Sequence, residues 1–513
     1  MPVVFQERKH VIAAGDRVTA EAAQELLWLG GNSFDGAVAA VFTSMVCEST
    51  LTSAGGGGCF LASPIDRPPI LFDFFVNMPG REVLDRDVDF FNIDVDFGGA
   101  KQEFHVGRGS AAVPGNIAGL LQVHRKLGRL PLEEALAPAI RAARDGVALS
   151  DRQAYLIGIL APILIHDELG KGLYAPQGEL LSQGDILVMP QFADFLTALA
   201  KEGADLFYRG DAARTIVNWA EEGGIIVFSD LADYRVVERD PLVSRFNGFE
   251  ILLNPPPAQS GVLIDVALAI LERKSQARSA TSLADLVRVF EVTNQFRAEM
   301  APFGPSPGLK VPVSETALFQ GYLDRFEEGW SSCGAAEEPE SRGSTTHLSV
   351  LDKEGNAASV TTTNGEGCGY LVPGLGFMLN NMLGEEDLNP QGFFRYPAGS
   401  RLSTMLAPTV VKKDGKPVLL TGTAGSNRIR SAVVQILINR LKHGMSIEEA
   451  TVAPRVHLDG DVLHVEPGIR EQDLSALPDS YRLKRWQEKN LFFGGANSVT
   501  PEDACGDARR GGR

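Results

Sequence analysis

Apolar residues recur at helical spacing through the first part of the chain. Residues 19–29 form one such run, which Gly30 and Gly31 end with a helix C-terminal signal. Ser33 is suited to cap a second helix that reaches about Cys47. The same period continues between about 110 and 300, for example at 132–144 and 192–201. These parts of the chain are therefore predicted to be rich in helices.

The pattern changes to that of β-strands near residue 345. Two strands joined by a turn at 352–356 are expected at 345–351 and 357–363. A second hairpin is expected over 409–421, and the loop 422–427 then leads into a helix at about 429–442. The second part of the chain is therefore predicted to contain two hairpins and a following helix.

The first hairpin makes a geometric prediction. With a five-residue turn, Leu351 faces Ala357 and Thr345 faces Thr363, so two hydroxyls meet at the open end of the ribbon. Residues 325–344 lead into that end and are polar, acidic and short of core residues. We expect them to form an exposed, mobile loop, which is a suitable place for chain cleavage.

Cleavage before Thr345 would give one residue both a hydroxyl and a free α-amine. Such an amine has a pKa near ~8 and can act as the general base for its own hydroxyl. Thr363 would then orient this nucleophile across the ribbon. The alternative is an ordinary pair of strand threonines, which the spacing alone leaves open.

The loop 422–427 lies between a strand and a helix N-terminus, where backbone N–H groups can converge on a developing oxyanion. Gly425 and Ser426 are the expected donors, and a plain strand-to-helix turn is the alternative. Ser403 and Thr404 are candidates for binding a substrate carboxylate. The four glycines at 55–58 indicate close backbone approach, and no Gly-Lys-Ser/Thr follows them as nucleotide binding requires.

Composition and charge narrow the partners. The chain of 513 residues is 44% hydrophobic and carries 48 basic against 65 acidic side chains, a net charge of −17. Nucleic acid and anionic membranes are therefore poor partners. No His-Glu-x-x-His or Cys-x-x-Cys pattern occurs, so no metal or other cofactor is expected. Five scattered cysteines, the absence of an apolar signal core and the lack of a membrane-length apolar run indicate a cytoplasmic protein.

These motifs together resemble the γ-glutamyltranspeptidase family over nearly the whole chain. The resemblance rests on Thr345-Thr346-His347-Leu348-Ser349-Val350 and on landmarks in the family's order: Gly30-Gly31-Asn32-Ser33-Phe34-Asp35, the four-glycine run, Val113-Pro114-Gly115-Asn116, Pro255-Pro256-Pro257, Asn380-Asn381, Ser403-Thr404-Met405 and Thr421-Gly422. It implies an α+β fold, a four-layer αββα sandwich of N-terminal-nucleophile hydrolases. It also implies cleavage between Ser344 and Thr345 into a large segment, 1–344, and a small segment, 345–513, intertwined in one domain.

Carried over from the family, Thr345 is the nucleophile and Thr363 its hydrogen-bonding partner. Gly425 and Ser426 would form the oxyanion hole, with serine in place of a second glycine at little cost, because a backbone N–H does the work. Ser403 and Thr404 would contact the substrate carboxylate. The implied partners are a small-molecule amide substrate and the two cleaved segments for each other.

Departures from the family pattern lie on the substrate side. Phe75 stands where the family has the arginine that binds the substrate α-carboxylate, which leaves an apolar wall. Gly365 replaces an asparagine, for which the adjacent Asn364 is a candidate substitute. Met382 replaces a glutamine, and Glu385 is the best candidate for the acidic residue that holds the substrate α-amine.

Three functions remain open on these residues. The first is a γ-glutamyl hydrolase or transpeptidase that acts on glutathione-like amides through an acyl-enzyme. The second keeps the mechanism with a different acyl group, as in relatives resembling cephalosporin acylases or oxamate amidohydrolase, and is favoured by Phe75 and Met382. The third is an uncleaved binding protein without catalysis, against which Thr345, Thr363 and the glycine loop argue.

Overall fold

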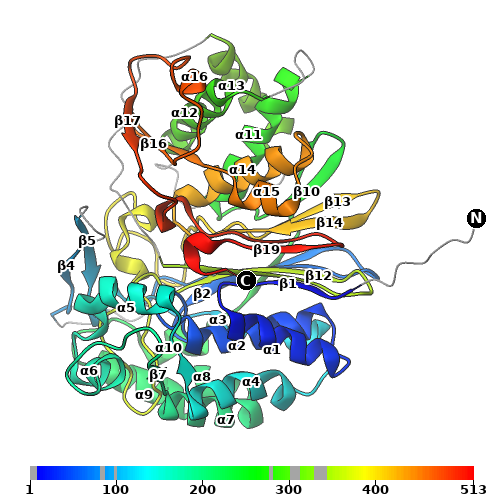
Figure 1. Cartoon of the computed structure of the whole chain (residues 1–513). Helices are drawn as coiled ribbons and strands as arrows, with labels where there is room; N and C mark the ends of the chain where they lie inside the picture. Colours follow the sequence, from blue (N-terminus) through cyan, green and yellow to red (C-terminus); the bar gives the residue numbers. More distant parts are fainter. Residues whose placement is uncertain are drawn as a thin grey trace, which may run out of the picture.

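The computed structural model describes residues 9–80, 87–96, 101–275, 281–300, 312–328 and 344–512. Within these ranges two six-stranded sheets lie over one another, with helices on both outer sides (Figure 1). The predicted α+β class is confirmed. No helix in the described ranges is long and apolar enough to cross a membrane.

The first sheet is antiparallel throughout. Its strand order is β1 (Val11–Ala13), β11 (Thr346–Leu351), β12 (Ala357–Thr363), β2 (Gly57–Ser63), β3 (Ile70–Phe74) and β8 (Val237–Arg239). The second sheet has the order β19 (Ala504–Gly506), β18 (Asn497–Val499), β14 (Lys416–Thr421), β13 (Thr409–Lys413), β10 (Phe249–Leu253) and β9 (Leu242–Phe246). The inner strands β11 and β12 are therefore covered by sheet or helix on both faces, and every residue in them is buried.

Helices from the first half of the chain cover the outer face of the first sheet (Figure 1). They include α1 (Arg17–Trp28), α2 (Ser33–Cys47), α3 (Asn116–Leu127), α4 (Leu132–Asp145), α5 (Asp151–Leu164) and α7 (Pro190–Glu202). The second sheet is covered by α11 (Gln259–Ser275), α12 (Leu283–Met300), α13 (Ala317–Glu327), α14 (Arg428–Leu441) and α15 (Ile447–Val452). The helices expected at 19–29, 33–47, 132–144, 192–201 and 429–442 thus match α1, α2, α4, α7 and α14 to within a few residues.

The cap of α2 differs from the prediction. Asn32, rather than Ser33, is the N-cap, because its side chain accepts hydrogen bonds from the N–H groups of Phe34 and Asp35. Asp35 in turn accepts from the backbone N–H of Asn32 at 2.9 Å, which completes a capping box. Ser33 is the first helical residue, and its backbone N–H donates to Asp352 in the hairpin turn. The cap therefore also joins α2 to the β11–β12 hairpin.

The predicted hairpin register is confirmed. Leu351 pairs with Ala357 and Thr346 with Thr362, so the next step places Thr345 opposite Thr363. The turn is fixed by one carboxylate, Asp352, whose Oδ1 accepts from the backbone N–H groups of the next three turn residues, 354–356. The turn therefore fixes the register of the whole hairpin, and this register places Thr345 opposite Thr363 at the far end of the ribbon.

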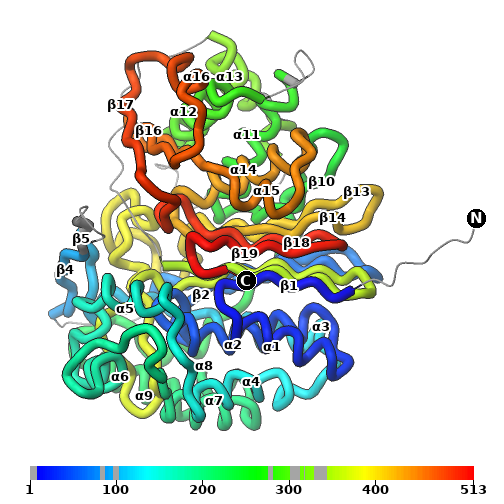
Figure 2. The backbone as a smooth tube through the Cα atoms, viewed as in Figure 1, coloured from blue at the N-terminus to red at the C-terminus, as the bar shows by residue number. Residues whose placement is uncertain are grey.

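The segments before and after residue 344 are interleaved in both sheets (Figure 2). β11 and β12 lie between β1 and β2 in one sheet, and β13 pairs with β10 in the other. One detail of the predicted linker is wrong, since α13 continues to Glu327. Residues 329–343 lie outside the described residues, and the division into segments 1–344 and 345–513 stays a prediction.

Candidate active site

The Ser344–Thr345 peptide bond lies just before the inner strand β11, which begins at Thr346. Both residues are buried, with Thr345 only 4% exposed. The Thr363 hydroxyl donates a hydrogen bond of 2.5 Å to the Ser344 carbonyl oxygen, and it accepts one of 3.0 Å from the Gly365 N–H. In the uncut chain the partner threonine therefore contacts the carbonyl of the bond that is predicted to break. A donor at this oxygen stabilises negative charge that develops there during attack on the carbonyl carbon.

Glu366 holds the other side of Ser344. Its Oε1 accepts the Ser344 backbone N–H at 3.1 Å, and its own N–H donates to Asn381 Oδ1 at 2.9 Å. Burial raises the pKa of Glu366 to about 8, against smaller opposing contributions from Ser344 and Asn381. Sequence reasoning missed this residue, although an acidic side chain three positions after Thr363 was an available signal.

A second carboxyl group, Glu385, lies close to Glu366. Burial raises the pKa of Glu385 well above its ordinary value, and the charges of Glu366 and Asp387 raise it further. Glu366 Oε2 and Glu385 Oε1 are buried without a hydrogen-bond partner among the described residues. Two acids in this situation cannot both ionise readily, so the pair retains a proton at neutral pH.

The four-glycine run explains how the chain reaches Thr363. β2 begins at Gly57 and pairs with β12, and a Cβ on Gly56 would lie 2.3 Å from the Thr363 carbonyl oxygen. The backbone N–H groups of Gly115 and Asn116, from the Val-Pro-Gly-Asn motif, both donate to the Gly56 carbonyl. The close backbone approach expected from these glycines is therefore an approach to the predicted partner threonine.

The loop 422–427 lies between β14 and α14, as predicted. Both expected oxyanion donors have positive φ, +120° at Gly425 and +48° at Ser426. The loop rests on β11, because a Cβ on Gly422 would lie 2.3 Å from the ring of His347. Burial lowers the pKa of His347 to about 3, so the ring is neutral, and its nitrogens are within hydrogen-bond distance of Thr361 and Ser349. The loop thus packs against an uncharged ring two residues after Thr345.

Phe75 is buried in the hydrophobic cluster that also contains Met382 and Met405. Its carbonyl oxygen accepts hydrogen bonds from Tyr234 Oη, at 2.7 Å, and from the Arg401 guanidinium. Position 75 therefore has an apolar side chain, and its backbone carbonyl oxygen is already hydrogen-bonded to Tyr234 and Arg401. No cationic group at this position faces a substrate carboxylate.

Arg401 and Arg428 are two arginines of the second part of the chain that could supply the cationic group that position 75 lacks. Arg401 donates to the carbonyls of Phe75 and Arg235 and to Tyr234, and its Nε lies 3.5 Å from Asp73. Arg428 donates to the Phe492 carbonyl at 3.2 Å, and its guanidinium lies 4.8 Å from the centre of the Phe492 ring. Arg401 is thus engaged by protein groups, and Arg428 stacks on an aromatic ring.

The remaining predicted substrate contacts are also occupied in part. The Ser403 hydroxyl donates to the Pro257 carbonyl at 2.9 Å, whereas the Thr404 hydroxyl accepts the Leu406 N–H at 3.2 Å. Asn364 accepts the Ser53 hydroxyl at 2.7 Å, so its amide anchors the loop after β12 to the segment before β2. The Leu402 N–H donates to the Val76 carbonyl, which brings the Ser403–Thr404 pair beside residues 75 and 76.

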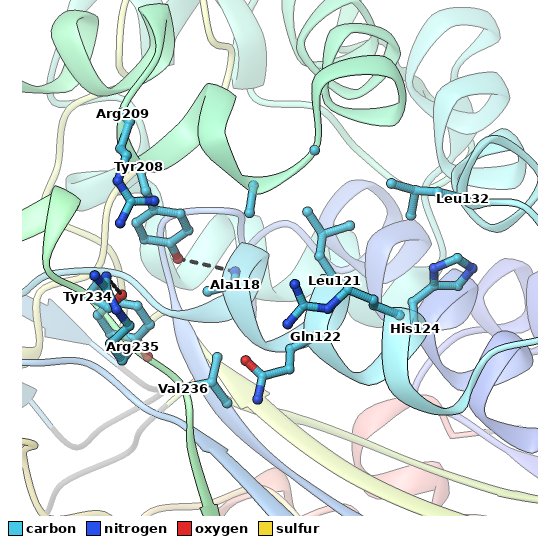
Figure 3. A pocket seen from close by; sticks show the side chains of 13 residues that line it. Ala118, Leu121, Gln122, His124, Leu132, Tyr208, Arg209, Tyr234, Arg235 and Val236 are labelled. Atoms are coloured by element: carbon cyan, nitrogen blue, oxygen red, sulfur yellow. Dashed lines mark hydrogen bonds between the residues drawn. The ribbon is translucent and has the colours of Figure 1, made fainter.

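A separate cavity of about 630 Å³ contains none of the predicted site residues (Figure 3). It lies between α3, α8 (Ala204–Tyr208) and residues 234–236, and Tyr208 on its wall accepts the Ala118 N–H. It is connected to the acyl side of the site through Tyr234, whose hydroxyl donates to the Phe75 carbonyl, and through Arg235, whose carbonyl accepts from Arg401. The cavity is therefore behind the acyl side of the site rather than part of it.

Two stacked sheets carry the arrangement that was expected from the sequence, in which a threonine enters an inner strand and a hydroxyl donates to the preceding carbonyl. The chain matches the family model described as gamma-glutamyltranspeptidase over residues 19–512. The chain therefore belongs to the gamma-glutamyltranspeptidase family, which confirms the resemblance, and it is an enzyme of the amidohydrolase type.

Known relatives of the chain include proteins named glutathione hydrolase and proteins named acylase. The chain is 29% identical over 498 residues to the glutathione hydrolase proenzyme of Escherichia coli strain K12, covering 92% of this chain and 85% of that protein. It is 31% identical over 483 residues to the acylase ACY 1 proenzyme of Pseudomonas sp. strain SE83, covering 91% and 86%. The structure of cephalosporin acylase from Bacillus halodurans superposes with a TM-score of 0.81 at 22% identity, over 100% of this chain and 97% of that one, which shows a shared fold.

Proposed function

We propose that the protein is a self-cleaving amidohydrolase whose nucleophile is Thr345. The observation that carries this proposal is the hydrogen-bond chain from the Gly365 N–H through the Thr363 hydroxyl to the Ser344 carbonyl. The bond to be broken is polarised by a buried donor, and the attacking residue follows it directly. The names of the relatives, several of them proenzymes, support processing of this kind.

Self-cleavage begins with attack of the Thr345 hydroxyl oxygen on the Ser344 carbonyl carbon. The hydroxyl proton is transferred to the Thr345 nitrogen, the C–N bond breaks, and Ser344 becomes esterified to the Thr345 side chain. Water then hydrolyses the ester, which leaves a carboxylate on Ser344 and a free α-amine on Thr345. The products are segments 1–344 and 345–513, which are expected to remain associated through the interleaved sheets.

Turnover repeats the same chemistry on a small-molecule amide. The Thr345 α-amine removes the hydroxyl proton, and the oxygen attacks the substrate carbonyl. The N–H groups of Gly425 and Ser426 stabilise the oxyanion of the tetrahedral intermediate. The proton is passed to the leaving amine, and an acyl ester on Thr345 forms. Water, or a second amine, then releases the acyl group.

The acyl group has two candidates. γ-Glutamyl amides are the first, because the family and the E. coli relative carry that chemistry in their names. An acyl group without a free α-carboxylate is the second, and the substrate side of the site favours it. Phe75 is apolar, Arg401 is engaged by protein groups, and Ser403 already donates to a carbonyl. A carboxylate would therefore lack a charged, bidentate donor.

The cell compartment is part of the proposal. We infer a cytoplasmic protein from the scattered cysteines, of which Cys47, Cys59, Cys368 and Cys505 are free thiols in the structure. No described group of three or more histidine, cysteine, aspartate or glutamate side chains is arranged to hold a metal ion. The mechanism above uses none.

Intact-mass analysis of purified protein tests the cleavage directly. Two species with the masses of 1–344 and 345–513 are expected, and Thr345→Ala should give one full-length species. A panel of γ-glutamyl, glutaryl and short aliphatic anilides then separates the acyl classes. A single full-length species in a preparation that hydrolyses any of these amides would contradict the proposal.

A further inference from the structure

Ser426 has a backbone conformation that is unfavourable for a residue with a Cβ. Its φ is +48°, in the left-handed region, next to Gly425 at +120°. Serine has no special tolerance for this region, unlike glycine, because its Cβ approaches the following carbonyl. If nothing opposed it, the loop would gain energy by rotating Ser426 to negative φ. That rotation would also turn the backbone N–H groups expected to bind the oxyanion.

One carboxylate opposes this rotation. Asp387 Oδ2 accepts the Ser426 hydroxyl at 2.5 Å, and Asp387 Oδ1 accepts the side-chain amide of Asn427 at 3.0 Å. Asp387 is only 6% exposed and lies in the short 3₁₀ turn η5 (Glu386–Leu388). The Arg297 guanidinium of α12 lies 3.6 Å from the same carboxylate. Both of its oxygens are thus used to hold consecutive residues of the loop.

We propose that Asp387 is a positioning residue that holds Ser426 in the left-handed conformation and so directs the oxyanion-binding N–H groups. The inference rests on the proposed function of the loop. Two hydrogen bonds to one buried carboxyl group are strong enough to offset a single strained residue. The hydroxyl of Ser426 is therefore the group through which the strain is held, and a side chain without one would lose the conformation.

The proposal distinguishes two substitutions that both remove the hydroxyl. Ser426→Ala keeps the Cβ and loses the tether, so the loop should relax and kcat should fall by about 10- to 100-fold. Ser426→Gly also loses the tether but removes the Cβ, and glycine adopts positive φ freely. We expect its kcat to exceed that of Ser426→Ala by at least about tenfold. KM should change little in either variant, because the N–H groups act mainly in the transition state.

Asp387→Asn completes the test from the other partner. It should lower kcat to about the level of Ser426→Ala, and Asp387→Asn combined with Ser426→Ala should lose little more. Combined with Ser426→Gly, it should recover activity relative to Asp387→Asn alone. Asp230→Asn is the matched control, because Asp230 is also buried and accepts two backbone N–H groups far from the loop. It should leave kcat unchanged.

The measurements are steady-state kinetics of cleaved protein on an anilide that the wild type hydrolyses, with thermal unfolding of each variant. Equal kcat values for Ser426→Ala and Ser426→Gly would overturn the positioning role. A direct role of Asp387 on a substrate ammonium would instead raise KM in Asp387→Asn and leave Ser426→Ala unaffected, which also overturns it. If Asp387→Asn fails to fold, the alanine and glycine pair decides alone. A wild type that neither cleaves itself nor hydrolyses any amide would refute the proposed function, and the positioning role with it.

Discussion

Replacement of Thr363 by alanine is the most direct perturbation of the predicted cleavage. The Thr363 hydroxyl is the only described side-chain donor to the Ser344 carbonyl, at 2.5 Å, and both residues are about 95% buried. Water therefore cannot take its place readily. Loss of one such donor from a developing oxyanion costs about 2.7 to 4 kcal/mol, or a factor of about 10² to 10³ in rate. We expect Thr363→Ala to slow self-cleavage by that factor.

The assay is a time course of intact mass on freshly purified precursor. Thr363→Ser keeps the hydroxyl and should cleave within about tenfold of the wild type, which separates the loss of a donor from a general disturbance. Thr215→Ala is the control on an exposed helix face, where the hydroxyl donates to the Asp211 carbonyl, and it should cleave normally. Thermal unfolding should show that Thr363→Ala remains folded, with a loss of about 1 to 3 kcal/mol for the unpaired buried groups. Cleavage of folded Thr363→Ala at the wild-type rate would refute the role of this hydrogen bond.

Three further predictions concern specificity and pH. Phe75→Arg should raise kcat/KM for a γ-glutamyl anilide relative to an aliphatic one, and tight glutathione binding by the wild type would contradict the reasoning from Phe75. The folded state favours neutral His347, whose pKa falls from 6.5 to about 3, so its stabilisation is present above pH 6.5 and is lost as pH falls. His347→Gln should therefore reduce the fall in the free energy of unfolding, measured by urea titration, by up to about 3 kcal/mol between pH 6.5 and 4. An unchanged pH dependence would exclude this contribution. Glu366 has a raised pKa of about 8, so the stability that it contributes below pH 4.5 is lost as pH rises towards 8. Glu366→Gln should remove part of that loss in the same assay. Equal changes in the free energy of unfolding with pH for both proteins would contradict this prediction.

Local rules were sufficient for the hairpin that carries Thr345. A turn of known length between two alternating strands determines which residues pair, and Asp352 supplies the turn contacts within four residues. The helices with clear 3.6-residue periods were predictable for the same reason. The family's ordered motifs supplied the fold, because composition and periodicity alone do not say how two sheets stack.

The contacts around Ser344 and Ser426 could not be obtained in this way. Glu366 lies 22 residues from Ser344 in sequence, and Asp387 lies 39 from Ser426. No periodicity connects such pairs, because Glu366 and Asp387 lie between β12 and β13 and reach Ser344 and Ser426 only when the chain is folded. The expectation that serine replaces glycine at little cost was incomplete, since it considered the N–H group and not the φ of +48°. A positive φ at a residue with a Cβ is visible only in the structure.

An arginine, Arg401, does lie beside position 75, but the protein itself binds its guanidinium. Arg401 binds the carbonyl of Phe75, the residue that replaces the family's arginine, yet its guanidinium is directed towards Tyr234 and Asp73. Asp73 is also bound by Arg239, at 2.8 Å, so its charge is already balanced by two cations. A third guanidinium at position 75 would meet like charge with no free carboxylate to offset it. The apolar wall at Phe75 is therefore consistent with the ion pairs behind it, and in Phe75→Arg the carboxylate of a γ-glutamyl substrate would be the group that offsets the added charge.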